Sequence, residues 1–162
     1  MSFNSRSHYT DYTFLDFDMK RMVSFEGDTG PYLQYAHARL CSILRRANAE
    51  AAKTETTIPE DLSTADFSVL AEPHAADLVR QLASWPDVFL NTVKTQEPAT
   101  VLTYLFKLGH AISSSYDHLQ VVNIENGVPK SVNVPRLALY TAARQVLNNG
   151  MRLLGLSPVE RM

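Results

Sequence analysis

The sequence predicts an all-α fold, a bundle of about five main helices, and three observations lead to this class. Apolar residues recur at three- and four-residue steps over most of the chain, which is the spacing of one buried helix face. Prolines stand at the beginning of these stretches, where a helix tolerates the missing N–H. Apolar residues make up 45% of the 162 residues, so the chain is long enough to bury a core without a metal or a disulfide.

The first predicted helix covers residues 32–49. Pro31 suits its first turn, and Asp28 and Thr29 are both candidate caps. Residues 49–61 are polar and show no period, so we interpret them as a loop. The predicted buried stripe consists of Leu33, Ala36, Leu40, Ile43, Leu44 and Ala47.

Three further helices are predicted to begin at Pro73, Pro86 and Pro98. The last of these runs over residues 98–119 and would be about 33 Å long at the usual rise per residue. The residues expected to point inward are Leu78, Val79 and Leu82, then Val88, Phe89 and Val93, and finally Val101, Leu102, Leu105, Leu108, Ile112 and Leu119.

Residues 121–134 break the helical pattern and favour either a small hairpin or an irregular loop. The pair Asn126–Gly127 is typical of a two-residue hairpin turn, and Pro129 confines any second strand to a sheet edge. Pro135 begins the last predicted helix, and Gly155 suits a left-handed stop after it. Its inward residues are Leu139, Ala143, Val146, Leu147, Met151 and Leu154.

The charges are unevenly distributed along the chain. The totals of 15 bases and 17 acids give a net charge of −2, which by itself argues against a nucleic-acid partner. Residues 29–49 nevertheless carry three arginines and no acid, and residues 126–162 carry five bases and one acid. Nine acids lie in residues 50–97. Two basic stretches therefore flank an acidic middle, which either marks a partner or reflects solvated helix faces.

Several kinds of chemistry lack their motifs in this sequence. Cys41 is the one cysteine, and the five histidines are scattered singly, so we predict neither a disulfide framework nor a metal site. No P-loop, dinucleotide fingerprint or zinc-protease motif occurs, and no run of apolar residues is long enough to span a membrane. The polar N-terminus lacks the apolar core of a signal peptide. We therefore predict no catalytic residues within these 162 residues.

The first helix carries a second stripe, formed by Tyr35, Arg39, Ser42 and Arg46. These residues share one helix face because they are spaced by four, three and four positions. An aromatic ring can stack an unpaired RNA base at about 1–3 kcal/mol, and arginines bind phosphate. The alternative is an ordinary solvated face with the tyrosine at its boundary.

A comparable polar stripe lies on the last helix, where Gln145 and Asn149 are its neighbours. Its side chains can donate to phosphate oxygens and base edges, or simply be solvated. Near the end of the long helix, Tyr116 is either a core residue or a stacking platform. The members of this stripe are Thr141, Arg144, Asn148 and Arg152.

Three blocks of the sequence resemble arginyl-tRNA synthetases. Residues 27–39, Gly-Asp-Thr-Gly-Pro-Tyr-Leu-Gln-Tyr-Ala-His-Ala-Arg, form the most specific match. Residues 135–147 are similar to the stretch that names the family's helical anticodon-binding (DALR) domain. Residues 155–162 resemble the C-terminus of the family's fungal or eukaryotic cytosolic form. Together with shorter matches, the resemblance covers nearly all of residues 17–162.

The resemblance implies a class I arginine–tRNA ligase, which uses ATP with Mg²⁺ to join arginine to its tRNA. The class I signatures and a Rossmann pattern do not occur here, so the resemblance implies a C-terminal part that binds no cofactor. Residues 1–26 would be the tail of the catalytic region and 27–162 the anticodon-binding domain. The implied partners are tRNA-Arg and the protein's own catalytic domain, with no membrane. We expect a monomer, located in the cytoplasm, with a mitochondrial form as the alternative.

The resemblance also assigns residues on the RNA side. It implies that Tyr35, Tyr116 and Met162 surround splayed anticodon-loop bases, and that Arg39 contacts backbone or a base. To these we add the stripe residues Arg46, Arg144, Asn148 and Arg152. The loop that would couple tRNA docking to the catalytic domain consists of Ser24, Phe25, Glu26, Gly27, Asp28 and Thr29.

One segment departs from the family pattern, and one other function stays open. Residues 122–133 are longer than the family's usual connection before the last helix, and an insert that folded over Tyr116 would cover its ring. The alternative function is a helical protein-interaction module that does not bind RNA. The two basic stripes favour RNA over this alternative.

Overall fold

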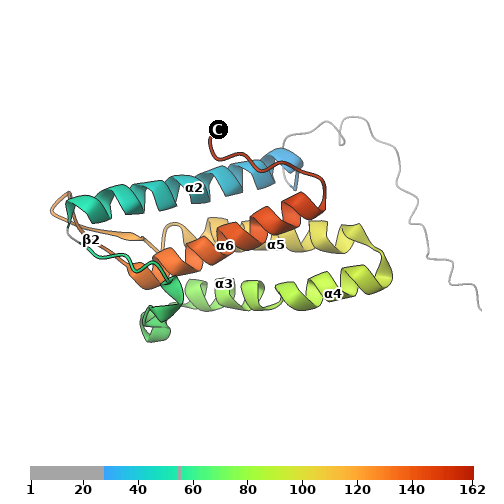
Figure 1. Ribbon diagram of the computed structural model, residues 1–162, viewed down its shortest axis with the longest axis horizontal. Helices are drawn as coiled ribbons and strands as arrows, with labels where there is room; N and C mark the ends of the chain where they lie inside the picture. Colours follow the sequence, from blue (N-terminus) through green and yellow to red (C-terminus); the bar gives the residue numbers. More distant parts are fainter. Residues whose placement is uncertain (1–27, 55) are drawn as a thin grey trace, which may run out of the picture.

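A computed structural model describes residues 28–54 and 56–162. The predicted tail, residues 1–26, and the loop residues 24–27 lie outside this range. The described chain is mostly helical, as predicted, with one small two-stranded sheet. Figure 1 shows three layers, with α2 above, α5 and α6 side by side in the middle, and α3 and α4 below.

Helix α2 spans Gly30–Lys53 and forms the upper layer. The side-chain oxygen of Thr29 accepts a hydrogen bond from the Tyr32 N–H at 3.4 Å, so Thr29 is the cap of the two candidates. The helix continues past the predicted end at residue 49, because Ala51 extends the buried stripe by one more turn. The predicted loop therefore begins later than expected.

The lower and middle layers begin with α3 (Pro73–Ala83), α4 (Trp85–Thr95) and α5 (Pro98–Ser115). Each has its proline in the first turn, as predicted. Two short 3-10 helices, Leu62–Thr64 and Phe67–Val69, precede α3. Helix α5 ends before residue 119, and Leu119 is nevertheless buried in the turn that follows.

The segment 121–134 forms a hairpin, which decides between the two sequence interpretations. Strands β1 (Val122–Glu125) and β2 (Val128–Val132) are antiparallel, and the pairing is irregular between Asn123 and Ile124. Asn126 and Gly127 have φ angles of 52° and 78°, the left-handed values that this turn requires. The hairpin packs β2 against α2.

Helix α6 spans Val134–Leu153 and completes the bundle. Asn133 caps it by accepting a hydrogen bond from the Arg136 N–H at 3.1 Å. Gly155 has φ 77° and reverses the chain, as predicted, so that residues 156–162 return along α2. In Figure 1 this segment runs from the end of α6 back above α2.

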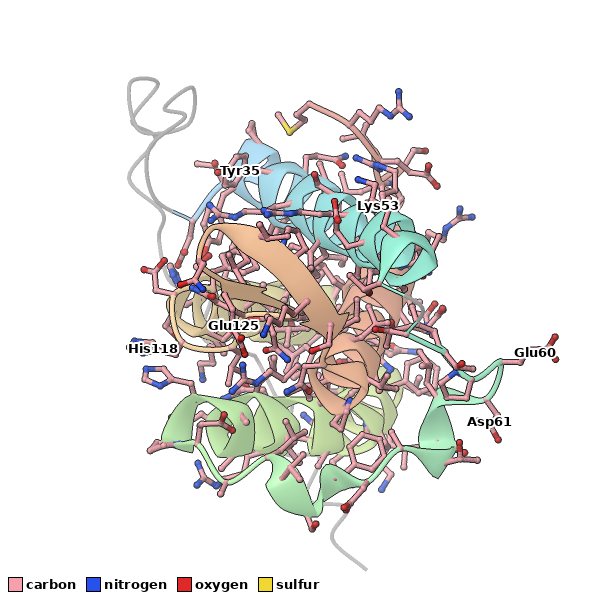
Figure 2. All side chains as sticks on the ribbon, turned by 90° about the vertical axis from the view of Figure 1, so that its left-hand side faces the viewer. Tyr35, Lys53, Glu60, Asp61, His118 and Glu125 are labelled. Atoms are coloured by element: carbon pink, nitrogen blue, oxygen red, sulfur yellow. The ribbon has the colours of Figure 1, made fainter. Side chains whose placement is uncertain are left out.

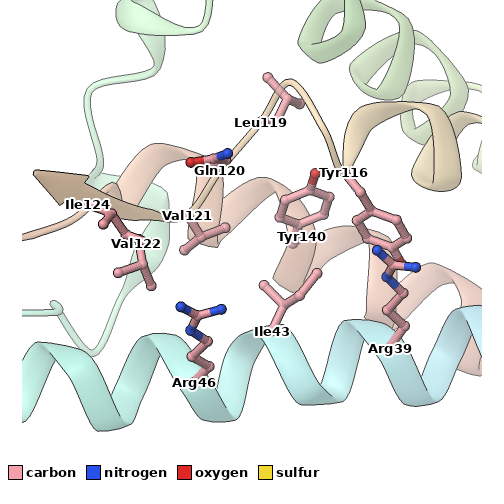
Figure 3. A pocket seen from close by; sticks show the side chains of 10 residues that line it. All are labelled: Arg39, Ile43, Arg46, Tyr116, Leu119, Gln120, Val121, Val122, Ile124 and Tyr140. Carbon is pink, nitrogen blue, oxygen red and sulfur yellow. The ribbon is translucent and has the colours of Figure 1, made fainter. Parts of the chain in front are cut away.

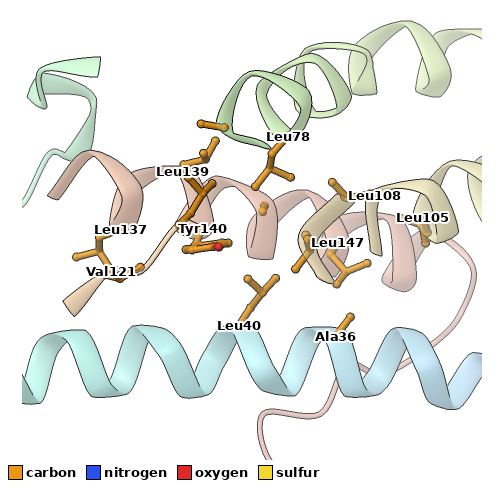
Figure 4. Close-up of a cluster of buried hydrophobic side chains, with 14 of the residues drawn as sticks. Ala36, Leu40, Leu78, Leu105, Leu108, Val121, Leu137, Leu139, Tyr140 and Leu147 are labelled. Carbon is orange, nitrogen blue, oxygen red and sulfur yellow. The ribbon is translucent and has the colours of Figure 1, made fainter. Parts of the chain in front are cut away.

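The core lies between the three layers, and Figure 4 shows part of it. Leu40 of α2, Leu105 of α5 and Leu147 of α6 are completely buried there. Four residues that we predicted to point inward are instead exposed, because no further layer covers the outer sides of α3, α4 and the first turns of α5. These residues are Val79, Phe89, Val93 and Leu102.

No helix in residues 28–54 and 56–162 combines the length and apolar character that crossing a membrane requires.

Candidate nucleic-acid interface

Tyr35 and Arg39 of α2 form one cluster with Tyr116, which follows the end of α5. The Arg39 guanidinium lies over the Tyr116 ring, 4.2 Å from its centroid, and its Nη1 donates to the Tyr35 hydroxyl at 3.1 Å. Such stacking on an aromatic face orients a guanidinium without neutralising it. Two residues from the predicted stripe are therefore joined to the predicted platform in a fixed arrangement.

Tyr116 is a partly buried residue that packs against the core, and its role as a stacking platform for a base stays a prediction. Its ring is partly buried and packs against Tyr140, with 6.0 Å between ring centroids. Burial raises the pKa of the Tyr116 phenol well above its ordinary value, because the charged phenolate would lose its hydration there. That hydroxyl oxygen is buried without a hydrogen-bond partner among the described residues. Because Arg39 covers one face of the ring, a base cannot reach that face while Arg39 holds this position.

A cavity of about 260 Å³ continues from Tyr116 along α2. Figure 3 shows Tyr116 and Arg39 at one end, Val122 and Ile124 of β1 at the other, and Arg46 between them on α2. The hairpin therefore forms a wall of the cavity, and Arg39, not the insert, lies over the Tyr116 ring. The cavity has apolar walls and two guanidinium groups at its edge.

Met162 lies on the other side of Tyr35 and Arg39. It lines a second hollow, of about 440 Å³, together with these two residues, Arg45 and Arg161. The Met162 side chain is 77% exposed and the Tyr35 side chain 49%. The structure thus brings together all four residues that the resemblance assigned to the anticodon loop; their contact with RNA stays a prediction.

The stripe on α6 does not join this cluster. Asn148 Nδ2 lies 3.4 Å from His37 Nε2 of α2, and Asn148 Oδ1 accepts from Arg152 Nε at 2.8 Å. At about 100° per residue, His37 and Arg39 point to nearly opposite sides of α2. The basic stripe of α6 therefore lies on the side of α2 that is nearly opposite to Arg39, and the two stripes do not form one surface. Arg144 is partly buried, and its Nε has no partner among the described residues.

The described end of the predicted coupling loop is tied to α5. Asp28 Oδ1 lies 2.8 Å from His110 Nε2, and His110 Nδ1 lies 3.3 Å from the Tyr32 hydroxyl. The same hydroxyl lies 3.2 Å from Ser113 Oγ. No sequence pattern pointed to His110 or Ser113, because both are distant from α2 along the chain.

In the part of the chain that the structure describes, the arginines of the two basic stripes are not neutralised by nearby carboxylates. Among the described residues, no carboxylate lies within ion-pair distance of Arg39, Arg46 or Arg152. Figure 2 shows Tyr35 and Lys53 on α2, and Glu60 and Asp61 projecting outward at the side of the bundle, below α2. Glu50 lies on α2 itself, but its carboxylate pairs with Lys53, so the arginines of α2 keep their charge available to an anion.

The fold and this cluster define a helical domain with a preassembled aromatic and cationic surface. A family model described as the DALR anticodon binding domain matches residues 33–162. The chain therefore belongs to the DALR anticodon binding domain family.

Similar proteins carry the names of arginine–tRNA ligases. The cytoplasmic arginine–tRNA ligase of Saccharomyces cerevisiae is 57% identical over 91% of this chain and 22% of its own length. The mitochondrial enzyme of the same yeast is 51% identical over 91% of this chain and 21% of its own. The solved arginyl-tRNA synthetase of Thermus thermophilus matches with a TM-score of 0.66 and 30% identity, covering 90% of this chain and 23% of that one. The chain thus spans about a fifth of the length of these relatives.

Proposed function

We propose that this chain binds the anticodon stem and loop of tRNA-Arg through the exposed face of α2. The observation that carries the proposal is the contact of Arg39 with both Tyr35 and Tyr116, on a helix face without acids. Loop bases are the single-stranded part of a tRNA that side chains can stack on and read at their edges. The relatives' names supply arginine as the amino acid.

We propose that unstacked bases enter the hollow between Tyr35 and Met162. Both side chains are largely exposed, so the apolar ring and thioether become buried only when a base is present. Arg39 is already held by two aromatic residues, so it loses little side-chain freedom when it binds a phosphate or a base edge. This preorganisation lowers the entropic cost of binding, and the exposed ring and thioether beside Arg39 favour a loop base over a simple anion.

The remaining stripe residues have more peripheral roles in this proposal. Arg46, at the cavity beside the hairpin, neutralises a phosphate further along α2 than the inserted bases. Arg152 and Arg144 contact the stem backbone on the other flank of α2, where Asn148 orients Arg152. Because these contacts are with phosphates, they contribute a salt-dependent part of the affinity.

We propose further that the whole protein is an ATP-dependent arginine–tRNA ligase, in which this domain orients the tRNA. The reaction needs ATP with Mg²⁺, but the described residues hold no group of three His, Cys, Asp or Glu side chains that could bind a metal. The described residues therefore do not fit a Mg²⁺–ATP site, and we assign the arginylation reaction to a separate catalytic domain of the whole protein. Residues 1–26 would lead from that catalytic domain into the domain of residues 27–162. We propose that the whole protein is a monomer in the cytoplasm.

The coupling loop is also a proposal. Asp28 and Thr29 begin α2 and, through His110, fix its first turn to α5. A rigid start of α2 would pass the position of the bound anticodon to the residues before it. We propose that Ser24, Phe25, Glu26 and Gly27 continue this link.

The test is a titration of the chain with two RNA hairpins at two salt concentrations. One hairpin carries the anticodon loop of tRNA-Arg, and the other has the same stem with a scrambled loop. We expect tighter binding of the first hairpin at both salts, and weaker binding of both at high salt. Absent binding at low salt, or equal affinity for both loops, would contradict the proposal and favour a protein-interaction module.

A further inference from the structure

The side chain of Gln34 holds the segment that carries Met162. Its Nε2 donates to the Ser157 carbonyl oxygen at 2.9 Å, and its Oε1 accepts from the Val159 N–H at 2.9 Å. One side-chain amide thus satisfies two backbone groups of a segment that belongs to neither a helix nor the sheet. Gln34 lies on α2 one residue before Tyr35, so it links the segment to the helix that carries the predicted base-binding residues.

His37 makes a third bond to the same segment, one turn further along α2. The ring is buried, and its Nδ1 lies 2.8 Å from the Val159 carbonyl oxygen. A carbonyl oxygen only accepts, so Nδ1 must carry the proton in this bond, and the other ring nitrogen, Nε2, lies 3.4 Å from Asn148 Nδ2. Val159 is therefore held at both its N–H, by Gln34, and its carbonyl, by His37.

The rest of the segment is fixed on either side of these bonds. The left-handed Gly155 reverses the chain after α6, and Leu156 packs against the core. Further on, Arg45 Nη1 donates to the Glu160 carbonyl oxygen at 3.1 Å. Met162 itself makes little contact with the bundle, since 77% of it is exposed. Its place beside Tyr35 and Arg39 is consequently set by the residues before it.

We propose that Gln34 and His37 are positioning residues for RNA binding, which hold residues 157–162 so that Met162 forms one side of the hollow beside Tyr35. The inference rests on the proposed function, because its effect is on anticodon-loop affinity. Ordering each backbone residue costs about 1–2 kcal/mol, so RNA would bind more weakly if it had to order residues 157–162 on binding. The bonds of Gln34 and His37 complete this ordering before RNA arrives.

The test is a double-mutant cycle on hairpin affinity with Gln34→Ala, Met162→Ala and both changes together. We expect each single change to weaken binding of the anticodon hairpin by about tenfold. The double variant should lose little more than either single variant, because the Gln34 effect acts through Met162. Losses that multiply to about a hundredfold, or no loss from Gln34→Ala, would overturn the inference.

Two further variants separate positioning from general stability. Gln34→Glu turns a carboxylate oxygen toward the Ser157 carbonyl oxygen, and because these two acceptors repel each other, its affinity should be no higher than that of Gln34→Ala. Gln81→Ala removes a helical glutamine side chain on α3, remote from the segment, and should leave affinity unchanged. An equal loss in Gln81→Ala would show that the effect is a general one.

Amide hydrogen exchange, measured without RNA, tests whether Gln34 holds the segment. The Val159 amide should exchange with solvent at least tenfold faster in Gln34→Ala than in the wild type, because its acceptor is gone, while core amides of α5 keep their protection. Unchanged exchange at Val159 would overturn the inference even if RNA binds. If the wild type bound no RNA, both the proposed function and the RNA role of Gln34 and His37 would fail. Amide exchange would still show whether Gln34 holds residues 157–162.

Discussion

The α2 face and the α3–α4 face of this domain come from similar sequence patterns but have different surroundings. On α2, one stripe is buried in the core, while Tyr35 and Arg39 meet Tyr116 on the outside. On α4, Phe89, Leu90 and Val93 remain exposed. The first face has its cations organised by aromatic contacts, whereas the second lies in the acidic part of the chain.

The contrast shows what helical periodicity can and cannot indicate. A stripe at three- and four-residue spacing identifies the apolar side of a helix, but it becomes buried only where another element covers it. Helix α2 meets α5, α6 and the hairpin, whereas α4 meets only α5 and α3 among its substantial contacts. The predicted apolar stripe of α2 is therefore buried, whereas part of the predicted stripe of α4 remains exposed.

The largest expected effect is the loss of a core side chain from α5. Leu105→Ala should lower the free energy of unfolding by about 2–5 kcal/mol, because Leu105 is fully buried between the layers. Urea denaturation measures this change. The matched control is Val93→Ala on α4, which should change stability by less than about 0.5 kcal/mol. Equal losses in both variants would mean that the α4 surface is covered in solution.

Removing the cation at the centre of the cluster should have the next largest effect. Arg39→Ala should weaken anticodon-hairpin binding by about 1–3 kcal/mol, because it removes a charge-assisted contact that Tyr116 and Tyr35 hold in place. Fluorescence anisotropy gives the dissociation constants. Lys94→Ala, an exposed base on α4, serves as the control and should leave them unchanged. A comparable loss in the control would contradict the difference between the faces.

Tyr35→Ala should remove a stacking surface without disturbing the fold. We expect a loss of about 1–2 kcal/mol in hairpin affinity and an unchanged melting temperature, since the side chain is about half exposed. Calorimetry and the same titration check the two parts. A large fall in melting temperature would instead assign Tyr35 to the core and refute its place on the outer stripe.

The smallest expected effect concerns an ion pair that ties the start of α3 to α6. Hydrogen bonding from Arg136 holds the pKa of Glu72 below its ordinary value of 4.5. Since the folded-state pKa is the lower one, the pair stabilises the fold fully above the unfolded pKa and loses this contribution as pH falls through the folded pKa. Glu72→Gln should cost about 1 kcal/mol at pH 7. In urea titrations the difference from wild type should shrink below about pH 4.5.

The local features of the fold could be predicted from the sequence. Pro31 predicted the start of α2, with Thr29 as one of two candidate caps, and Asn126–Gly127 made a hairpin turn one of two interpretations, because these signals depend on neighbouring residues. The end of α2 could not be predicted, since its last turn is stabilised by burial of Ala51 in the tertiary core. Polar sequence around that residue concealed the contact.

The candidate site divides in the same way. Tyr35 and Arg39 are one turn apart, so their shared face followed from helix geometry. Their meeting with Tyr116 and Met162 came only from the resemblance, because no pattern links segments so far apart in the chain. The bonds of Gln34 and His37 to Val159 were missed for this reason.

RNA binding at the α2 face is tested most directly by a map of backbone amide chemical shifts in the labelled chain during titration with the anticodon hairpin. We expect the largest changes in the first half of α2, around Tyr116 and in residues 157–162, and small changes along α3 and α4. Changes concentrated on α3 and α4, with α2 unaffected, would contradict the assignment of RNA binding to the α2 face.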